Sequence, residues 1–205
     1  MCVLVSMLYK GYNKFGYKST RDDLVLKKEV NQMENVIEAI KNRRSIRKFK
    51  PDMISKDIIE QIVTAGTYAA TGMNKQSPII IAITNKDVRN QLSKLNAEIM
   101  GTTSDPFYGA PVVLIVLADK TWVNHVYDGS LVMGNLMLAA HSLGIGSCWI
   151  HRAKEEFERP EGKQLLKSLG IEGEYEGIGH CVLGYVDGEY PKVPARKENW
   201  VYYID

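Results

Sequence analysis

The sequence of 205 residues has few cysteines and almost no excess of either charge. Its three cysteines, Cys2, Cys148 and Cys181, are widely spaced and form no C-x-x-C pair. This pattern is typical neither of a disulfide framework nor of a zinc site, so we expect a reducing, cytoplasmic setting. The 26 basic and 24 acidic residues nearly balance, and charge alone therefore predicts no binding to nucleic acid or to a membrane.

Long apolar runs and metal-ligand clusters are also missing. No apolar stretch approaches the roughly 18 residues that a membrane-spanning helix needs. The apolar start from Met1 to Met7 lacks the leading basic residue and the cleavage pattern of a signal peptide. The histidines lack metal-ligand spacing, so we expect packed or surface residues and no metal site; they are His125, His141, His151 and His180.

The first 32 residues differ from the rest of the chain. They mix Tyr, Gly, Asn and Lys without a sustained helical or strand period. A helical pattern begins only near Met33, with Val36, Ile37 and Ile40 on one face. We therefore expect residues 1–32 to be a poorly ordered extension or a misassigned start, and residues 33–205 to form one domain.

Helical and strand patterns then alternate, which predicts an α/β-type domain. Ser55 is a suitable N-cap for a second helix, and Gly144 is a suitable C′ residue for a long helix over residues 127–143. Further helices are expected near residues 87–98 and 160–169, and strands at residues 79–83, 112–117, 147–150 and 181–186. The 127–143 helix is apolar nearly all round, which fits either a core helix or a subunit interface.

Three arginines and a serine lie within five residues just after the first helix, as Arg43, Arg44, Ser45 and Arg47. Guanidinium groups bind phosphate through paired, charge-assisted hydrogen bonds, and the serine adds a neutral donor. The segment therefore predicts an anion site, although a solvated basic helix end would contain the same residues.

A polar loop, Ala69–Pro78, leads into the strand at residues 79–83. Thr71, Asn74 and Gln76 offer hydrogen bonds to the edge of a heterocycle, and Gly72 lets a ligand approach the backbone closely. Read alone, this segment is an ordinary connection between a helix and a strand.

A third segment, Leu143–His151, begins with the glycine spacing of a dinucleotide-binding fingerprint. Trp149 stands in place of the third glycine, and the segment follows a helix and enters a strand, the reverse of the Rossmann order. We therefore reject a Rossmann site.

Together and in this order, these segments resemble the nitroreductase family of FMN-dependent oxidoreductases, from about Met33 to the C-terminus. The motifs are R-R-S-I-R at 43–47, T-G-M-N-x-Q-S-P at 71–78, G-A-P at 109–111, L-G-I-G-S-C-W-I-H at 143–151 and G-Y-x-x-G-x-x-P at 184–191. The resemblance implies an α+β fold, a three-layer sandwich of a mixed sheet flanked by helices. It also implies an obligate homodimer with FMN at the subunit interface.

The resemblance assigns a first group of residues to the phosphate and ring edge of FMN. Arg43, Ser45 and Arg47 would hold these groups, and Arg44 would contribute mainly through its backbone. A basic pair near the C-terminus, Arg196 and Lys197, would complete the phosphate site.

A second group is assigned to the flavin ring. Thr71, Gly72 and Asn74 would reach the FMN held mostly by the other subunit, and Gln76 would lie close by. The strand residues that would lie beside the isoalloxazine ring are Trp149, Ile150 and His151.

The implied activity is hydride transfer from NADH or NADPH to a small organic acceptor, such as a nitroaromatic compound or a quinone, by a ping-pong mechanism. The flavin carries this chemistry, so no catalytic side chain is assigned. Two alternatives stay open: a related FMN-dependent dehalogenase or enone reductase, and a flavin store or redox sensor without rapid turnover. A nucleic-acid module built on residues 43–48 is disfavoured, because the basic cluster is short and lacks an aromatic platform.

Two further segments receive expectations. Residues 99–108 contain glycine and proline, and we expect them to form a mobile part of the substrate pocket. The tail from Trp200 to Tyr203 is expected to pack on the domain or to act as a subunit clasp.

Overall fold

A computed structural model describes residues 36–204, in which the strands form a single sheet in the order β1–β2–β4–β3. The strands are β1 (Pro78–Ile83), β2 (Val112–Asp119), β3 (Gly146–Ile150) and β4 (Tyr175–Gly184). All neighbouring strands are antiparallel. The family resemblance implies a mixed sheet. Within residues 36–204, the only parallel pairing is one bridge between Ser45 and Ser147.

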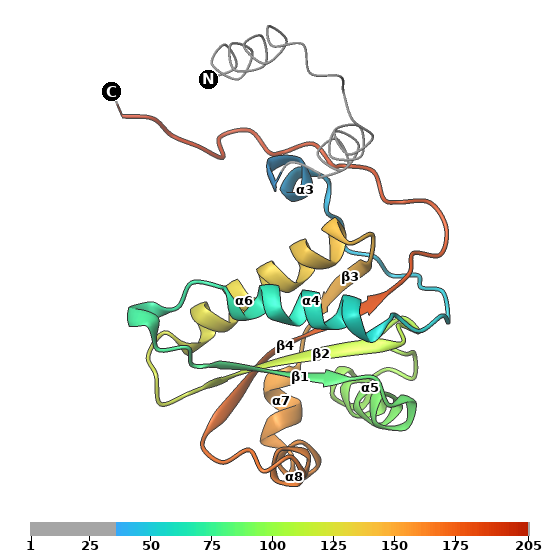
Figure 1. Ribbon diagram of the computed structural model, residues 1–205, viewed down its shortest axis with the longest axis vertical. Coiled ribbons are helices and arrows are strands. Elements are labelled where there is room, and N and C mark those ends of the chain that lie inside the picture. Colours follow the sequence, from blue (N-terminus) through green and yellow to red (C-terminus); the bar gives the residue numbers. More distant parts are fainter. Residues whose placement is uncertain (1–35, 205) are drawn as a thin grey trace, which may run out of the picture. The chain divides into compact units, whose positions relative to one another are not determined.

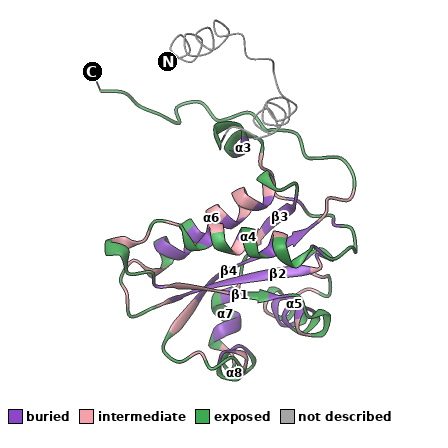
Figure 2. Ribbon diagram, in the orientation of Figure 1, coloured by how far each residue is buried: buried purple, intermediate pink, exposed green. Residues whose placement is uncertain are grey.

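Helices cover both faces of this sheet (Figure 1). One face carries α4 (Lys56–Thr67) and α6 (His125–Ser142), whose apolar side chains share a core with alternate residues of β2. The other face carries α5 (Lys86–Met100), α7 (Ala153–Glu158) and α8 (Pro160–Ser168) around a second core. Figure 2 shows that β2, which lies inside the sheet, is buried along its length. The expected three-layer α+β arrangement is confirmed.

Local signals fix several element boundaries as predicted. Ser55 caps α4, and its side chain accepts a hydrogen bond from the Ile58 N–H. Gly144 follows α6 with a φ of 72°, the left-handed conformation that glycine adopts at no steric cost. The helix α7 was not predicted, and β4 begins at Tyr175, six residues earlier than expected. Gly177 and Gly179 weaken the strand signal in that part of β4, because glycine has a low strand propensity.

The first described helix, α3 (Val36–Asn42), has the apolar face that its sequence pattern predicts. Its side chains Val36, Ile37 and Ile40 are nevertheless exposed in the single chain, and Ala39 is the buried residue of this helix. The predicted extension of residues 1–32 and the domain start at Met33 lie outside the described residues and stay predictions. None of the helices in residues 36–204 has the length and apolar character of a membrane span.

The segment 99–108 was expected to be mobile, but its second half is a fixed turn. The Asp105 carboxylate accepts hydrogen bonds from Arg89 and Ser93, at 2.5 Å each, and from the N–H groups of Phe107 and Gly109. Phe107 is fully buried. Burial raises the pKa of Asp105, but these hydrogen bonds outweigh it and hold the pKa below its ordinary value of 3.8. These bonds argue against mobility of residues 105–108, and a role of segment 99–108 in the substrate pocket stays a prediction.

We expect Asp105→Ala to lower the free energy of unfolding by about 2 kcal/mol at neutral pH, because it leaves the buried Arg89 without its ion-pair partner. The carboxylate's contribution is fully present above the ordinary pKa and is lost as the pH falls through the lower folded-state pKa. Urea unfolding in a pH series measures both effects. The exposed Asp52→Ala is the control, and an Asp105 variant that unfolds like this control contradicts the fixed turn.

Candidate functional site

The arginine segment that follows α3 runs in extended form beside β3. The Ile46 N–H donates to the Ser147 carbonyl at 2.9 Å, and the Lys50 N–H donates to the Tyr185 carbonyl at 2.9 Å. Ile46 and Phe49 are buried in the core on the α5 side. The arginines therefore belong to a segment that is fixed against the sheet, in which Arg43 and Arg44 are half-buried and Arg47 is exposed.

Three of the predicted anion-binding residues converge on one position of β3. Ser45 pairs with Ser147 of β3 in a parallel bridge, next to Cys148. Burial raises the pKa of the Cys148 thiol, while Arg47, Ser45 and Arg43 each lower it in part. Two motifs that are about a hundred residues apart in the sequence, R-R-S-I-R and L-G-I-G-S-C-W-I-H, thus form one cluster. We call Arg43, Ser45 and Arg47 the arginine cluster.

The arginine cluster has unused capacity for an anion. The Nη1 atom of Arg43 is buried and has no hydrogen-bond partner within residues 36–204. In the same part of the chain, no acidic side chain forms an ion pair with Arg43 or Arg47. A buried donor without a partner costs about 1–3 kcal/mol, and more when it is charged. A phosphate-like anion would remove this cost.

Arg44 differs from its neighbours, because its groups are largely engaged within the chain. Its guanidinium donates to the carbonyl groups of Arg43 and Lys41. Its backbone N–H, through which it was expected to act, donates to the Tyr190 hydroxyl at 3.0 Å. That hydroxyl also bonds to Nδ1 of His141 at 2.9 Å.

The second predicted region, the loop of residues 71–77, has an unusual backbone. Met73, Asn74 and Gln76 have φ values of 51°, 54° and 49°, which is left-handed backbone that side chains other than glycine rarely adopt. Each such residue costs on the order of 1–3 kcal/mol, and strain of this kind clusters at functional sites. Within the loop, the Gln76 N–H donates to Thr71 Oγ1 at 3.2 Å, and the Gln76 side chain donates to Asn74 at 3.1 Å. An ordinary connection between a helix and a strand does not describe this loop.

The loop and the arginine cluster lie at opposite ends of the sheet. Ser147, beside the cluster, is level with Leu183 and hence with Val112 at the start of β2. The loop enters β1 at Pro78, which is level with Ala118 near the end of β2. At about 3.3 Å per residue, these levels are about 20 Å apart. A single chain therefore does not bring the two predicted regions into one small site.

The three predicted strand residues have different environments. Trp149 is half-buried and packs against Gly179, and Ile150 is buried in the core on the α5 side. His151 is exposed, and its carbonyl accepts a hydrogen bond from Asn96 Nδ2 at 2.8 Å. The Ile150 side chain is therefore unavailable to a ligand, and only its backbone remains.

A buried polar network behind His151 was missed by the sequence reasoning. Asn96 also donates to Glu156, and Glu156 bonds to Nε2 of His180 at 3.1 Å. All three side chains are fully buried. The one signal in the sequence was a polar residue at a core-facing position of a helix, which does not reveal its partners.

The C-terminal basic pair is separate from the arginine cluster in this chain. Arg196 and Lys197 lie on an exposed tail, where Arg196 donates to the Pro194 carbonyl and the Lys197 Nζ lies 5.1 Å from the Trp200 ring centre. Within residues 36–204, neither side chain bonds to Arg43, Ser45 or Arg47.

Comparison with known proteins places the chain in a family. Residues 40–185 match the model of the Nitroreductase family, and the chain belongs to this family. A candidate NADH dehydrogenase/NAD(P)H nitroreductase of Methanothermobacter thermautotrophicus is 30% identical over 153 residues, which cover 69% of this chain and 72% of the relative. The NADPH-flavin oxidoreductase of Vibrio harveyi is 30% identical over 176 residues, which cover 80% and 70%.

Solved structures of the family have the same fold. The crystal structure of a nitroreductase with bound FMN from Bacteroides fragilis matches with a TM-score of 0.77 and 28% identity, over 84% of this chain and 100% of that one. A nitroreductase with bound FMN from Desulfitobacterium hafniense matches with a TM-score of 0.73 and 25% identity, again over 84% and 100%.

Gly179 determines where Trp149 lies, and this can be tested. An alanine Cβ at residue 179 would lie against the Trp149 indole, 2.8 Å from Cε2. We expect Gly179→Ala to destabilise the fold by about 2 kcal/mol through overpacking. The double variant with Trp149→Leu should recover part of this loss. Urea unfolding of the single and double variants gives the coupling energy, and purely additive effects would contradict the contact.

Proposed function

We propose that this protein is an FMN-dependent oxidoreductase that transfers hydride from NADH or NADPH to a small organic acceptor, such as a nitroaromatic compound or a quinone, by a ping-pong mechanism. Family membership supports this activity, as do the V. harveyi NADPH-flavin oxidoreductase and a Bacillus subtilis FMN reductase (NADPH) that is 24% identical. We assign it to the reducing cytoplasm, in keeping with the free, buried Cys148 and Cys181.

The observation that carries the proposal is the buried, unpartnered Nη1 of Arg43 among residues 36–204. Arg43, Ser45 and Arg47 suit a phosphate monoester, because two guanidinium groups and a hydroxyl supply donors and no acidic group of the described chain opposes it. We infer that they hold the FMN phosphate and ring edge, and that Arg44 mainly braces this segment. When the dimer forms, Arg196 and Lys197 on the exposed tail would contact the phosphate.

The distance between the two candidate regions within one chain argues for a homodimer. The strained loop lies about 20 Å along the sheet from the arginine cluster, so Thr71, Gly72, Asn74 and Gln76 would serve the FMN of the other subunit. FMN, when bound, supplies the hydride-accepting chemistry. The chain's own residues then orient it, with Trp149 and the Ile150–His151 backbone beside the ring, and leave one face open to nicotinamide and acceptor in turn.

An exposed apolar stripe on α6 supports the same assembly. Tyr127, Leu131, Gly134 and Leu138 recur at spacings of four, three and four, so they lie on one face of the helix. Tyr127 is 71% exposed and Leu131 is 50% exposed, whereas Leu138 is half-buried. Packing this stripe against a second copy would bury it, and Gly134 would let the two helices approach closely.

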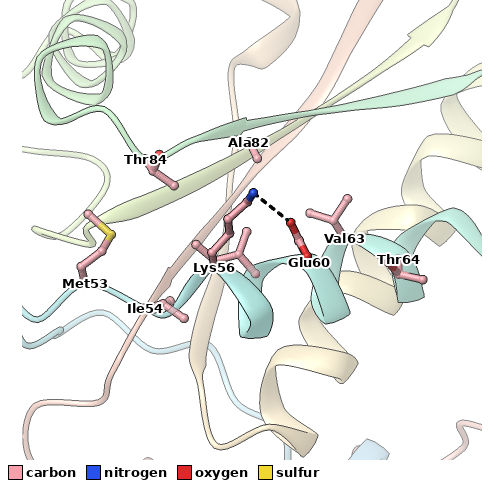
Figure 3. Close-up of a pocket in the computed structure, with 9 residues that line it drawn as sticks. Met53, Ile54, Lys56, Glu60, Val63, Thr64, Ala82 and Thr84 are labelled. Atoms are coloured by element: carbon pink, nitrogen blue, oxygen red, sulfur yellow. Dashed lines mark ion pairs between the residues drawn. The ribbon is translucent and has the colours of Figure 1, made fainter.

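The tail and a groove provide a second contact for the dimer. An apolar groove of about 690 Å³ lies between α4 and β1 (Figure 3), with Met53, Ile54 and Val63 in its wall. It adjoins the outer edge of β1, which pairs with no other strand of residues 36–204. The tail residues Val201 and Tyr202 are exposed. We take the tail of one subunit to be the clasp that fills this groove of its partner.

The activity is tested with the purified full-length protein. We expect a yellow protein whose released pigment is FMN, and rapid mixing with NADH or NADPH should bleach the flavin absorbance before an added quinone or nitroaromatic compound restores it. Arg43→Gln should weaken FMN binding to the apoprotein by at least about tenfold, since a hydrogen bond to a charged group is worth about 1.5–3 kcal/mol.

Arg159→Gln is the matched control, because the Arg159 side chain is 42% exposed and pairs only loosely with Glu98 at 3.8 Å. FMN that stays oxidised with both nucleotides favours a flavin store or sensor over a reductase. A colourless protein that takes up no FMN overturns the proposal.

The dimer is tested by charging the α6 stripe. We expect Leu131→Arg to shift the protein from dimer to monomer and to lower FMN affinity, because a desolvated arginine opposes burial of the stripe. Sedimentation measures the assembly. Leu169→Arg is the control, since Leu169 is 52% exposed and lies outside the stripe. A Leu131 variant that stays dimeric contradicts this interface.

A further inference from the structure

We propose that Asp128 is a positioning residue that holds the strained loop of residues 71–77 in the conformation required by the flavin site. The proposal rests on the proposed function, because it concerns the half of the site that one subunit lends to the other. Asp128 lies in the first turn of α6 and does not itself belong to the predicted flavin-binding residues.

The Asp128 carboxylate is buried and bonded to three donors. Asp128 is only 3% exposed. Oδ1 accepts from the Gly72 N–H at 2.9 Å, and Oδ2 accepts from Trp122 Nε1 at 3.0 Å and from the Ser77 hydroxyl at 3.3 Å. No basic side chain of residues 36–204 forms an ion pair with it. The carboxylate therefore depends on these neutral donors for its stabilisation.

Two of the three donors bracket the loop. Gly72 lies before the left-handed residues Met73, Asn74 and Gln76, and Ser77 lies directly after them. A strained backbone conformation persists only where several contacts with the surrounding structure hold it in place. The internal bonds of Thr71, Asn74 and Gln76 tie the loop to itself, whereas Asp128 ties both of its ends to a helix.

The third donor closes the contact from behind. Trp122 and Asn124 press against Gly72 so closely that a Cβ on Gly72 would lie 2.6 Å from Asn124 Nδ2 and 3.2 Å from Trp122 Cζ2. The Lys75 ammonium lies 5.8 Å from the centre of the Trp122 ring. The loop thus packs against Trp122 and Asn124, which directly precede α6.

This arrangement links the loop to the proposed subunit interface. Asp128 directly follows Tyr127, the first residue of the exposed α6 stripe. A rigid helix that carries both groups places the loop in a fixed position relative to the partner subunit. We therefore expect loop order and FMN affinity to depend on the same carboxylate.

The test uses Asp128→Asn in the full-length protein. The amide can still accept from Gly72, but its NH2 group then faces the Trp122 N–H, so that two donors oppose each other. Trypsin cleaves after lysine, and Lys75 lies in the loop. We expect cleavage of the apoprotein after Lys75 to accelerate about tenfold and FMN to bind the apoprotein about tenfold more weakly. Cleavage after Lys192 in the exposed tail is the internal reference and should not change.

Three further variants sharpen the result. Adding Trp122→Phe to Asp128→Asn removes the opposing donor and should restore part of both losses. Ser77→Ala removes one bond without altering the charge, and should act in the same direction by about threefold; it keeps the test decisive if Asp128→Asn does not fold. Asp119→Asn is the matched control, because the Asp119 side chain bonds to Thr121 and to no residue of the loop.

The outcomes separate this proposal from the proposed function. If the wild-type apoprotein binds FMN and both Asp128→Asn and Ser77→Ala leave cleavage at Lys75 and FMN affinity unchanged, the positioning role is wrong. If the wild-type protein binds no FMN, the proposed function fails, and faster cleavage at Lys75 in the variants still supports the contact between Asp128 and the loop.

Discussion

The antiparallel pairing of β2 with β1 and β4 is the constraint on which the proposed site depends. It fixes the arginine cluster at the Val112 end of the sheet and the strained loop at the Ala118 end. The separation of about 20 Å is a property of the hydrogen-bonded ladder and does not yield to side-chain rearrangement. If both regions serve one flavin, they come from two chains, and the exposed stripe on α6 and the exposed tail then have a purpose within a single assembly.

Apolar side chains that are buried next to the arginine cluster determine where this half of the site lies. Ile46 and Phe49 enter the core, and the backbone between them bonds to residues 147 and 185, so the register of the segment is set by apolar packing. This register holds Arg43 half-buried at a position where its Nη1 finds no acceptor within residues 36–204. Folding has thus already desolvated a charged donor, and an anion that meets it gains a bond without having to displace much water.

The sequence predicts those parts of the molecule that local chemistry decides. The N-cap at Ser55, the left-handed Gly144 and the β-branched strands follow from rules that act over a few residues, and the structure confirms them. The fixed turn at Asp105 was missed because its strongest partner, Arg89, lies 16 residues away. The same limit applies to Asn96, whose bond to Glu156 spans 60 residues. The roles of the candidate flavin residues came from family resemblance, since hydrogen-bonding capacity alone identifies no ligand.

The two helical layers carry a common device for holding loops. On the α6 side, buried Asp128 binds the backbone of Gly72; on the α5 side, buried Asn96 binds the carbonyl of His151. Both residues are polar where helix packing alone would favour an apolar side chain, and both bond to backbone groups of segments predicted to meet the flavin. Because a buried side chain holds the backbone donor or acceptor, the direction of that group is set before a ligand binds. We therefore infer that Asp128 and Asn96 serve to determine where the loops of the proposed site lie, and not primarily to stabilise the fold.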